Sequence, residues 1–345
     1  MKSAFLNGDL EEEVYVEQPQ GFQVKGHEHD VFLLKKALYG LKQAPRAWYQ
    51  KIDAFLLSLK FQRTHADNNL YVLMVDNDIC ILVLYVDDLL LTGSNKDLIG
   101  WVQSHLLSTF AMTNLGLLHY FLGLEVWQHA SGIFLCQQKY ATHLLEKYGM
   151  KDCASISCPM DPNSKLSIHD ESPKYDSTAY RQLIGSLLYL VNTRPDLAYA
   201  MNVLSQFSNQ PQHSHWQAAQ RVLRYIHGTL AFGINYIGGD ALAGYSDSDW
   251  AGCIDTRRST SGYCFILGGG PISWKSQKQR ITSSSSIEAE YKAYLDATSK
   301  ALWIQQILTH LGFSSSTSTL IYSNSQSAIA LAKNPIICGR SKHID

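Results

Sequence analysis

The chain has 345 residues, of which 46% are hydrophobic and 17% are charged, and its formal net charge is −1. These proportions are typical of a globular protein with two or three domains, and they exclude a largely disordered chain. They also exclude a global electrostatic attraction to nucleic acid, so nucleic-acid binding would depend on local basic patches.

Membrane and secretory proteins are two further classes that the sequence argues against. No apolar run reaches the roughly 18 residues that a membrane-spanning helix needs, and the N-terminus has no charged-then-apolar signal segment. The seven cysteines form no C-x-x-C pair and no zinc-finger spacing, which fits a reducing compartment. We therefore expect a soluble intracellular protein without a membrane partner.

Apolar periodicity predicts alternating strands and helices up to Gly149. The predicted strands cover residues 31–34, 70–75, 79–84 and 89–92. The predicted helices are one with Trp48, Ile52, Phe55 and Leu56 on its apolar face, then residues 97–110 and 138–147. A strand pair is also predicted within Tyr120 to Val126.

The most informative stretch is Ile79 to Gly93, ICILVLYVDDLLLTG. Its apolar run predicts a strand that is buried on both faces and that leads into Asp87 and Asp88. Two buried carboxylates repel each other and lose hydration, so a pair of divalent metals, as at sites of phosphoryl chemistry, would compensate them. A tight turn is an equally good interpretation of Asp-Asp between two strands.

A second group of helices follows the proline-containing linker 158–177. Residues 180–191 predict an amphipathic helix, and Thr193-Arg194-Pro195-Asp196 predicts a capping box that opens a helix to about Phe207. A third helix has Trp216, Ala219, Leu223 and Ile226 on one face. Its Arg221 and Arg224 lie off that face, where they either are solvated or meet a nucleic-acid backbone.

From Leu242 the period changes to that of strands, which indicates a new domain. The predicted strands cover residues 242–245, 262–267, 272–275 and 320–323, and the predicted helices cover residues 287–311 and 326–333. Three antiparallel strands, a helix, a strand and a helix is the order in which a ribonuclease H fold starts.

Motifs along the whole chain resemble the Pol polyprotein of copia-type (Ty1/copia, Pseudoviridae) LTR retrotransposons. They are AFLNGDLEEEVYVEQPQGF, ALYGLKQAPRAWYQK, LYVDDLLLTG, YFLGLEV, YRQLIGSLLYLVNTRPDLAYA, HWQAAQRVLRYIHGT, YSDSDWAGCIDTRRSTSGY and SSSSIEAEYKA. The resemblance implies an α+β fold, in which the palm and thumb of a reverse transcriptase (a partial right-hand polymerase fold) precede a ribonuclease H-like domain.

The domain boundaries implied by this resemblance are 1–152 for the partial reverse transcriptase, 153–238 for a linker and helical connection, and 239–345 for the ribonuclease H-like domain. In the family, the segment that matches Lys2 to Gly8 follows a strand whose Asp is the first metal-binding carboxylate. We therefore expect the fingers and that Asp upstream of Met1, and the last ribonuclease acid beyond Asp345.

The family's functional residues transfer to ten positions of this sequence. Those implied to be catalytic and metal-binding are Asp87, Asp88, Asp247 and Glu290; those implied to bind nucleotide or template are Lys42, Gln43, Arg46 and Tyr85; those implied to grip the primer are Leu122 and Gly123. From the residues alone, Lys42, Gln43 and Arg46 could instead decorate a surface turn, and Leu122 and Gly123 could belong to a plain strand pair.

Two further positions match the ribonuclease motifs less well. Glu288 is a poorer candidate than Glu290, because it lies about 200° away around the helix at ~100° per residue. Asn324 stands where the family has an Asp, so this position keeps the shape of the ligand and loses its charge.

The resemblance implies an RNA-directed DNA polymerase with ribonuclease H activity that uses Mg²⁺ or Mn²⁺. Its partners would be an RNA template, a DNA primer, the RNA–DNA hybrid and other Pol or Gag products, in a cytoplasmic virus-like particle or the nucleus. Because the carboxylate sets are incomplete, we expect this chain to be inactive. The alternative is a non-catalytic nucleic-acid-binding or assembly remnant of a degenerate element.

Overall fold

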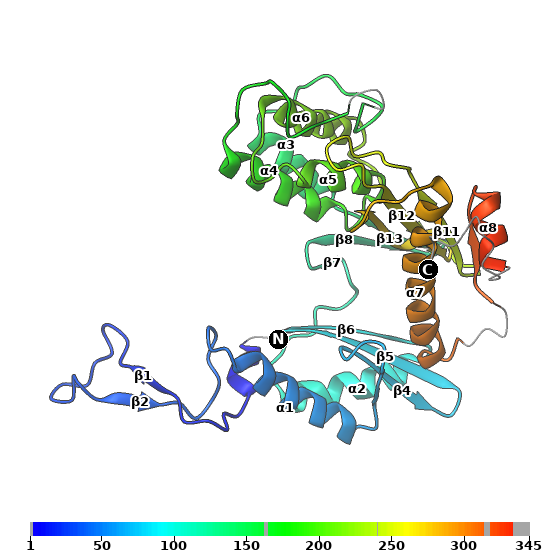
Figure 1. Cartoon of the computed structure of the whole chain (residues 1–345). Helices are drawn as coiled ribbons and strands as arrows, with labels where there is room; N and C mark the ends of the chain where they lie inside the picture. Colours follow the sequence, from blue (N-terminus) through cyan, green and yellow to red (C-terminus); the bar gives the residue numbers. More distant parts are fainter. Residues whose placement is uncertain (1–2, 162–164, 240, 314–317, 334–345) are drawn as a thin grey trace. The chain divides into compact units, whose positions relative to one another are not determined.

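The computed structural model has a mixed α/β fold and describes residues 3–161, 165–239, 241–313 and 318–333 (Figure 1). The described residues form two compact units. The first contains residues 3–116 and 303–313, and the second contains the remainder. Among the described residues, no helix is long and apolar enough to cross a lipid bilayer.

A four-stranded antiparallel sheet with the order β3-β4-β5-β6 lies at the centre of the first unit. Its strands are β3 Gln62–Arg63, β4 Leu70–Val75, β5 Asp78–Tyr85 and β6 Asp88–Gly93. Two helices, α1 Ala44–Ser58 and α2 Lys96–Thr109, pack on it through a shared core that contains Trp48, Ile52, Leu56, Tyr71, Leu82, Leu84, Val102 and Leu106. The predicted strands and helices of this segment are confirmed.

The prediction that the central strand is buried on both faces is wrong. Cys80, Leu82 and Leu84 of β5 are buried, whereas the alternate residues Ile81 and Val83 are only half-buried. The physical reason is that α1 and α2 contribute to the core on one side of the sheet, and successive side chains of a strand point to opposite sides.

The first unit begins with a 3₁₀ helix, η1 Ala4–Asn7, and a two-stranded antiparallel sheet of β1 Tyr15–Glu17 and β2 Val31–Leu33. The loop between these strands is organised by Gln18, which is 8% exposed. The Gln18 side chain donates a hydrogen bond to the carbonyl of Asp30 at 2.9 Å and accepts one from the backbone N–H of Val24 at 2.7 Å.

The second unit starts with a four-stranded antiparallel sheet of order β10-β9-β8-β7. Its strands are β7 Tyr120–Phe121, β8 Leu124–His129, β9 Gly132–Cys136 and β10 Gly233–Tyr236. Strand β10 was not predicted. It pairs with β9 so that Ile234 lies opposite Leu135, although about a hundred residues separate them in the sequence.

Four helices, α3 Gln138–Lys147, α4 Ser177–Leu190, α5 Ala198–Ser205 and α6 His213–Gly228, share one core. They match the predicted helices. Nε of Arg224, on α6, donates a hydrogen bond to the carbonyl of Ala154 at 2.8 Å. The side chain is therefore not simply solvated, and this atom is not available to nucleic acid.

The predicted capping box at Thr193 to Asp196 is wrong. Thr193 donates its hydroxyl to Oε1 of Gln137 at 2.9 Å, and Asp196 accepts from Arg194 and from the hydroxyl of Tyr225. Because Gln137 binds the Thr193 hydroxyl, and Arg194 and Tyr225 bind the Asp196 carboxylate, neither side chain caps the helix, and a short 3₁₀ helix, η2 Pro195–Leu197, precedes α5.

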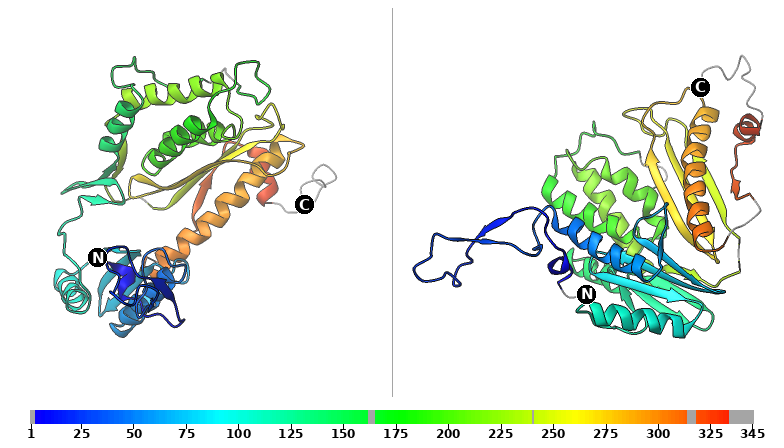
Figure 2. Two further views of the ribbon diagram at one scale, coloured as in Figure 1. Left: turned by 90° about the vertical axis from the view of Figure 1, so that its left-hand side faces the viewer. Right: turned by 90° about the horizontal axis from the view of Figure 1, so that it is seen from below.

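The last sheet has the order β13-β12-β11-β14, with β14 parallel to β11 and the other pairs antiparallel. Its strands are β11 Ala243–Ser248, β12 Thr260–Leu267, β13 Gly270–Lys278 and β14 Leu320–Tyr322. Helix α7 Ser286–His310 lies beside this sheet in both views of Figure 2, and α8 Gln326–Lys333 follows β14. The hydroxyl of Tyr294 on α7 donates to Ser323 at 2.7 Å.

Candidate functional site

Asp87 and Asp88 lie at the turn between β5 and β6. Tyr85 pairs with Asp88 across the hairpin, so Val86 and Asp87 form a two-residue turn. Asp88 is exposed and Asp87 is half-buried. The tight-turn interpretation of the sequence is therefore confirmed, and the expected buried carboxylate pair is wrong, because the strand reaches the surface before the two carboxylates.

This exposure changes the expected energetics of the pair. Since water screens charges on exposed side chains, we expect Asp88→Asn to change the free energy of unfolding by less than about 0.5 kcal/mol in EDTA. Urea unfolding of the two proteins measures the difference. A stabilisation above about 1 kcal/mol would show that the repulsion is unscreened.

The turn has an unusual backbone. Val86 has a φ of +53°, which a β-branched residue adopts rarely. The indole Nε1 of Trp48, on α1, donates a hydrogen bond of 2.6 Å to the carbonyl of Val86. The first turns of α1 thus contact the turn that carries the carboxylates.

Lys42, Gln43 and Arg46 lie at the start of α1, within two helical turns of Trp48. Lys42 and Arg46 are exposed, and Gln43 is half-buried at the N-cap position. Tyr85, at the end of β5, is 53% exposed. Trp48 joins α1 to the carboxylate turn, whereas Arg46 lies about 200° from Trp48 around the helix at ~100° per residue and so points away from that contact.

The other hairpin singled out by the sequence is in the second unit, where Leu122 and Gly123 form the turn between β7 and β8. Their φ values are +50° and +78°. The hydroxyl of Tyr189, on α4, donates to the carbonyl of Leu122. The φ of Gly123 favours glycine, and a Cβ there would lie 2.0 Å from that hydroxyl, so a larger residue would displace the Tyr189 side chain.

A second pair of carboxylates joins Asp247 on β11 with Glu290 on α7. Glu290 is 6% exposed, and its Oε2 has no hydrogen-bond partner. Burial, helped by the charge of Asp247, raises the pKa of Glu290 to about 7, although the backbone N–H of Ser248 opposes this. A bound divalent cation would offset both the repulsion and the unpaired oxygen, so these residues fit Mg²⁺ or Mn²⁺.

Asn324 lies at the same end of this sheet. The parallel register places Tyr245 opposite Tyr322, so Asp247 and Asn324, two residues further along each chain, occupy matching positions. Both line a cavity of about 890 Å³. The parts of the chain that the structure describes contain no group of three or more His, Cys, Asp or Glu residues that could hold a metal.

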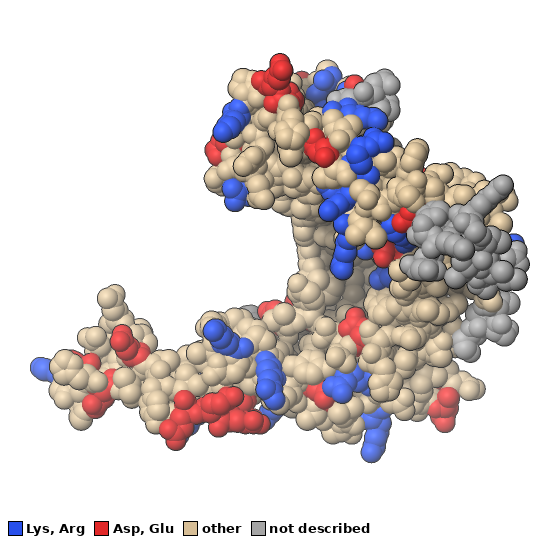
Figure 3. All heavy atoms as spheres, viewed as in Figure 1, with Lys and Arg blue, Asp and Glu red and all other residues tan. Residues whose placement is uncertain are grey.

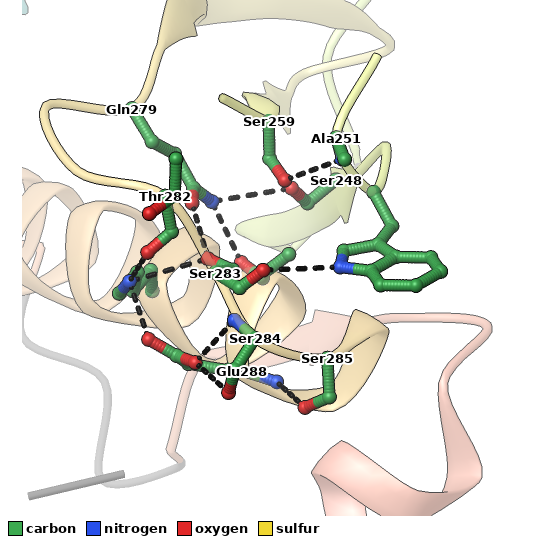
Figure 4. Close-up of polar contacts among 12 residues, drawn as sticks. Ser248, Ala251, Ser259, Gln279, Thr282, Ser283, Ser284, Ser285 and Glu288 are labelled. Atoms are coloured by element: carbon green, nitrogen blue, oxygen red, sulfur yellow. Dashed lines mark hydrogen bonds and ion pairs between the residues drawn. The ribbon is translucent and has the colours of Figure 1, made fainter. Parts of the chain in front are cut away.

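Glu288 lies outside this carboxylate site. Its carboxylate accepts hydrogen bonds from the backbone N–H and the hydroxyl of Ser284, at 2.8 and 2.7 Å, and pairs with Lys292 at 2.6 Å (Figure 4). Although burial raises its pKa, the contacts with Lys292 and Ser284 outweigh burial and lower the pKa to about 2. Glu288 therefore stabilises the start of α7.

Sequence reasoning missed Gln279, which follows β13. Its Nε2 donates to Ser261 at 2.7 Å and to the carbonyl of Ala289 at 2.9 Å, and its Oε1 accepts from Ser283 at 2.8 Å (Figure 4). These contacts tie the sheet to the N-terminal turn of α7 and so place Glu290. A single glutamine in a polar loop has no sequence signal for this role.

The surface carries charges of both signs. Figure 3 shows Lys and Arg side chains beside Asp and Glu side chains on the face in view. Contacts with nucleic acid would thus depend on local groups such as Lys42 and Arg46.

Comparisons with known proteins give one matching family model and several relatives. A family model described as reverse transcriptase (RNA-dependent DNA polymerase) matches residues 1–162. A retrovirus-related Pol polyprotein from transposon TNT 1-94 of Nicotiana tabacum is 41% identical over 100% of this chain and 27% of its own length. One from transposon RE2 of Arabidopsis thaliana is 42% identical over 100% of this chain and 24% of its own length.

A shorter relative is matched almost completely. An uncharacterized mitochondrial protein of Arabidopsis thaliana is 43% identical over 64% of this chain and 93% of its own length. By contrast, the chain spans about a quarter of the length of the two Pol polyproteins.

Proposed function

Because this chain belongs to the retrovirus-related Pol proteins of copia-type transposons, we propose that it contributes to RNA-directed DNA synthesis with Asp87 and Asp88 as metal-binding carboxylates. The observation that carries this proposal is the β5–β6 hairpin, whose turn presents both carboxylates and is hydrogen-bonded to α1 through Trp48. In this assignment residues 1–152 form palm and thumb, and residues 153–238 form the linker and helical connection.

Each group at this turn has a task that its position supports. Asp87 and Asp88 would hold divalent cations, which would supply stabilisation of negative charge for phosphoryl transfer. Lys42 and Arg46 would neutralise phosphate charge at the start of α1, with Gln43 beside them. The exposed ring of Tyr85 would contact the nucleotide, and Leu122 with Gly123 would contact the primer strand.

For residues 239–345 we propose a ribonuclease H-like domain with a weakened metal site. The sheet order β13-β12-β11-β14 and the meeting of Asp247 with Glu290 support it. Asn324 can offer an amide oxygen to Mg²⁺ but adds no charge, so metal binding at this site should be weak.

The second candidate is nucleic-acid binding without chemistry. Two observations favour it. Asn324 adds no charge to the metal site, and the described residues contain no group of three or more His, Cys, Asp or Glu that could hold a metal ion. We therefore expect the 345-residue chain to bind a primer annealed to an RNA template and not to extend it in Mg²⁺. The RNA template, the DNA primer and other Pol or Gag products would be its partners.

The test measures primer–template affinity by fluorescence anisotropy in EDTA and in Mn²⁺. We expect Mn²⁺ to tighten binding to the parent chain, and the change Asp87→Asn with Asp88→Asn to abolish this gain and leave binding in EDTA intact. Equal affinities in all conditions would refute a metal role for the turn. Nucleotide incorporation that Asp88→Asn abolishes would instead show an active polymerase.

A further inference from the structure

The turn that carries Asp87 and Asp88 adopts a conformation that its own sequence disfavours. Val86 stands at φ +53°, in the left-handed region, where a side chain branched at Cβ crowds the backbone. Such a conformation persists only where surrounding contacts over-determine it. The contact that holds Val86 there therefore decides how the two carboxylates are presented.

Trp48 supplies that contact from α1. Its indole is 2% exposed and packs edge-on against Phe110, with ring centroids 5.5 Å apart and planes at 87°. Nε1 of this fixed ring donates to the carbonyl of Val86 at 2.6 Å. The donor is therefore preorganised by the core, and the acceptor belongs to the strained residue itself.

We propose that Trp48 is the positioning residue of the Asp87–Asp88 turn. Its N–H holds the carbonyl of Val86 and, through it, the left-handed backbone that directs both carboxylates to one place. Trp48 itself touches neither metal nor substrate. The inference rests on the proposed function, because the conformation of the turn affects catalysis only if Asp87 and Asp88 hold a metal.

Loss of this hydrogen bond should relax the turn and leave the unit folded. Val86 is 43% exposed, so its turn can move toward solvent when the hydrogen bond is lost. A phenylalanine at position 48 keeps an aromatic ring against Phe110 and removes the donor together with part of the buried indole. A Val86→Gly background separates the lost hydrogen bond from the lost packing.

The first measurement is Mn²⁺ affinity by electron paramagnetic resonance. Asp88→Asn should abolish Mn²⁺ binding at this turn and so identify it. We expect Trp48→Phe to weaken that binding by about tenfold, as removal of outer-shell partners does. Trp101→Phe is the matched control, since Trp101 lies on α2 of the same unit, is 44% exposed and contacts His105 with the ring planes tilted by 46°. We expect it to leave Mn²⁺ affinity unchanged.

The second measurement repeats Trp48→Phe in a Val86→Gly background. Glycine adopts φ +53° without strain, so the turn should no longer need the indole, and the loss should fall to less than about threefold. A tenfold loss in both backgrounds would mean that Trp48 acts through packing, and no loss in either would mean that it does not position the turn. Both results overturn the proposal.

A third readout separates this inference from the proposed function. The ¹H–¹⁵N indole resonance of Trp48, identified by its absence in Trp48→Phe, should be protected from solvent exchange without metal. If the parent chain binds no Mn²⁺ through Asp88, the metal role of the turn is refuted. The hydrogen bond is still tested, because the indole proton should be protected in the parent and should exchange fast in Val86→Pro. Fast exchange of that proton in the parent would overturn the proposal.

Discussion

Glu290→Gln is expected to stabilise the metal-free protein at pH 8 by roughly 3 kcal/mol of unfolding free energy, at about 1.36 kcal/mol per pKa unit. Glu290 is 6% exposed, and its pKa rises from 4.5 to about 7 in the folded state. At pH 8 the folded protein must therefore keep a buried carboxylate charged beside Asp247. Glutamine has nearly the same shape and removes that cost.

The pH dependence follows from the direction of the shift. Because the folded state holds the proton of Glu290 more tightly than the unfolded state, the stability of the parent should fall as pH rises from 4.5 to 7 and then level off. In Glu290→Gln this fall should disappear. Urea unfolding in EDTA at pH 5 and pH 8 measures both proteins.

Divalent metal should narrow the difference in stability between the two proteins. A cation held by Asp247 and Glu290 binds only the folded state, so Mn²⁺ should stabilise the parent more than Glu290→Gln at pH 8. If Glu290→Gln is less stable than the parent in EDTA at pH 8, the carboxylate is satisfied by contacts other than a metal, and the assignment of this site is wrong.

Glu288→Gln should have the opposite effect and destabilise the protein by about 2 kcal/mol at pH 7, since charged hydrogen bonds contribute ~1.5–3 kcal/mol each when buried. Glu288 is 8% exposed, and its carboxylate binds Ser284 and Lys292 at the start of α7. The neutral amide loses the ion pair and one acceptor oxygen. The change is chemically identical to Glu290→Gln, so each variant is the matched control of the other.

The pH windows of the two residues also differ in sign. The pKa of Glu288 is lowered from 4.5 to about 2, so its contribution is complete above pH 4.5 and is lost as pH falls toward 2. The stability difference between parent and Glu288→Gln should therefore shrink over that range in urea unfolding curves. A constant difference from pH 7 to pH 2 would show that packing, rather than charge, is lost.

Local elements were predictable from the sequence because their signals are local. Strand β4 Leu70–Val75 and helix α8 Gln326–Lys333 have the predicted bounds, since apolar period and flanking polar residues act over a few neighbours. The spacing argument that separates Glu288 from Glu290 also needs only the helical period. The family was accessible in the same way, through short motifs in a fixed order.

Other features needed contacts between distant segments. Strand β10 pairs with β9, although the four helices α3 to α6 separate the two strands in the sequence. Thr193 and Asp196 bond to Gln137 and Tyr225 in place of capping α5. A propensity rule describes what a side chain does when only its neighbours compete for it. At Thr193 and Asp196, hydrogen bonds to residues remote in the sequence replace the local capping bonds.

The chemical state of the candidate site was decided by the tertiary structure alone. The sequence by itself determined that carboxylates stand at positions 87, 88, 247 and 290, and that an amide stands at 324. Only the fold made Asp88 exposed and Glu290 buried, and only the fold placed Trp48 against Val86. Burial and hydrogen bonding depend on which distant surfaces meet, and these two quantities set the cost of a charge or a strained turn.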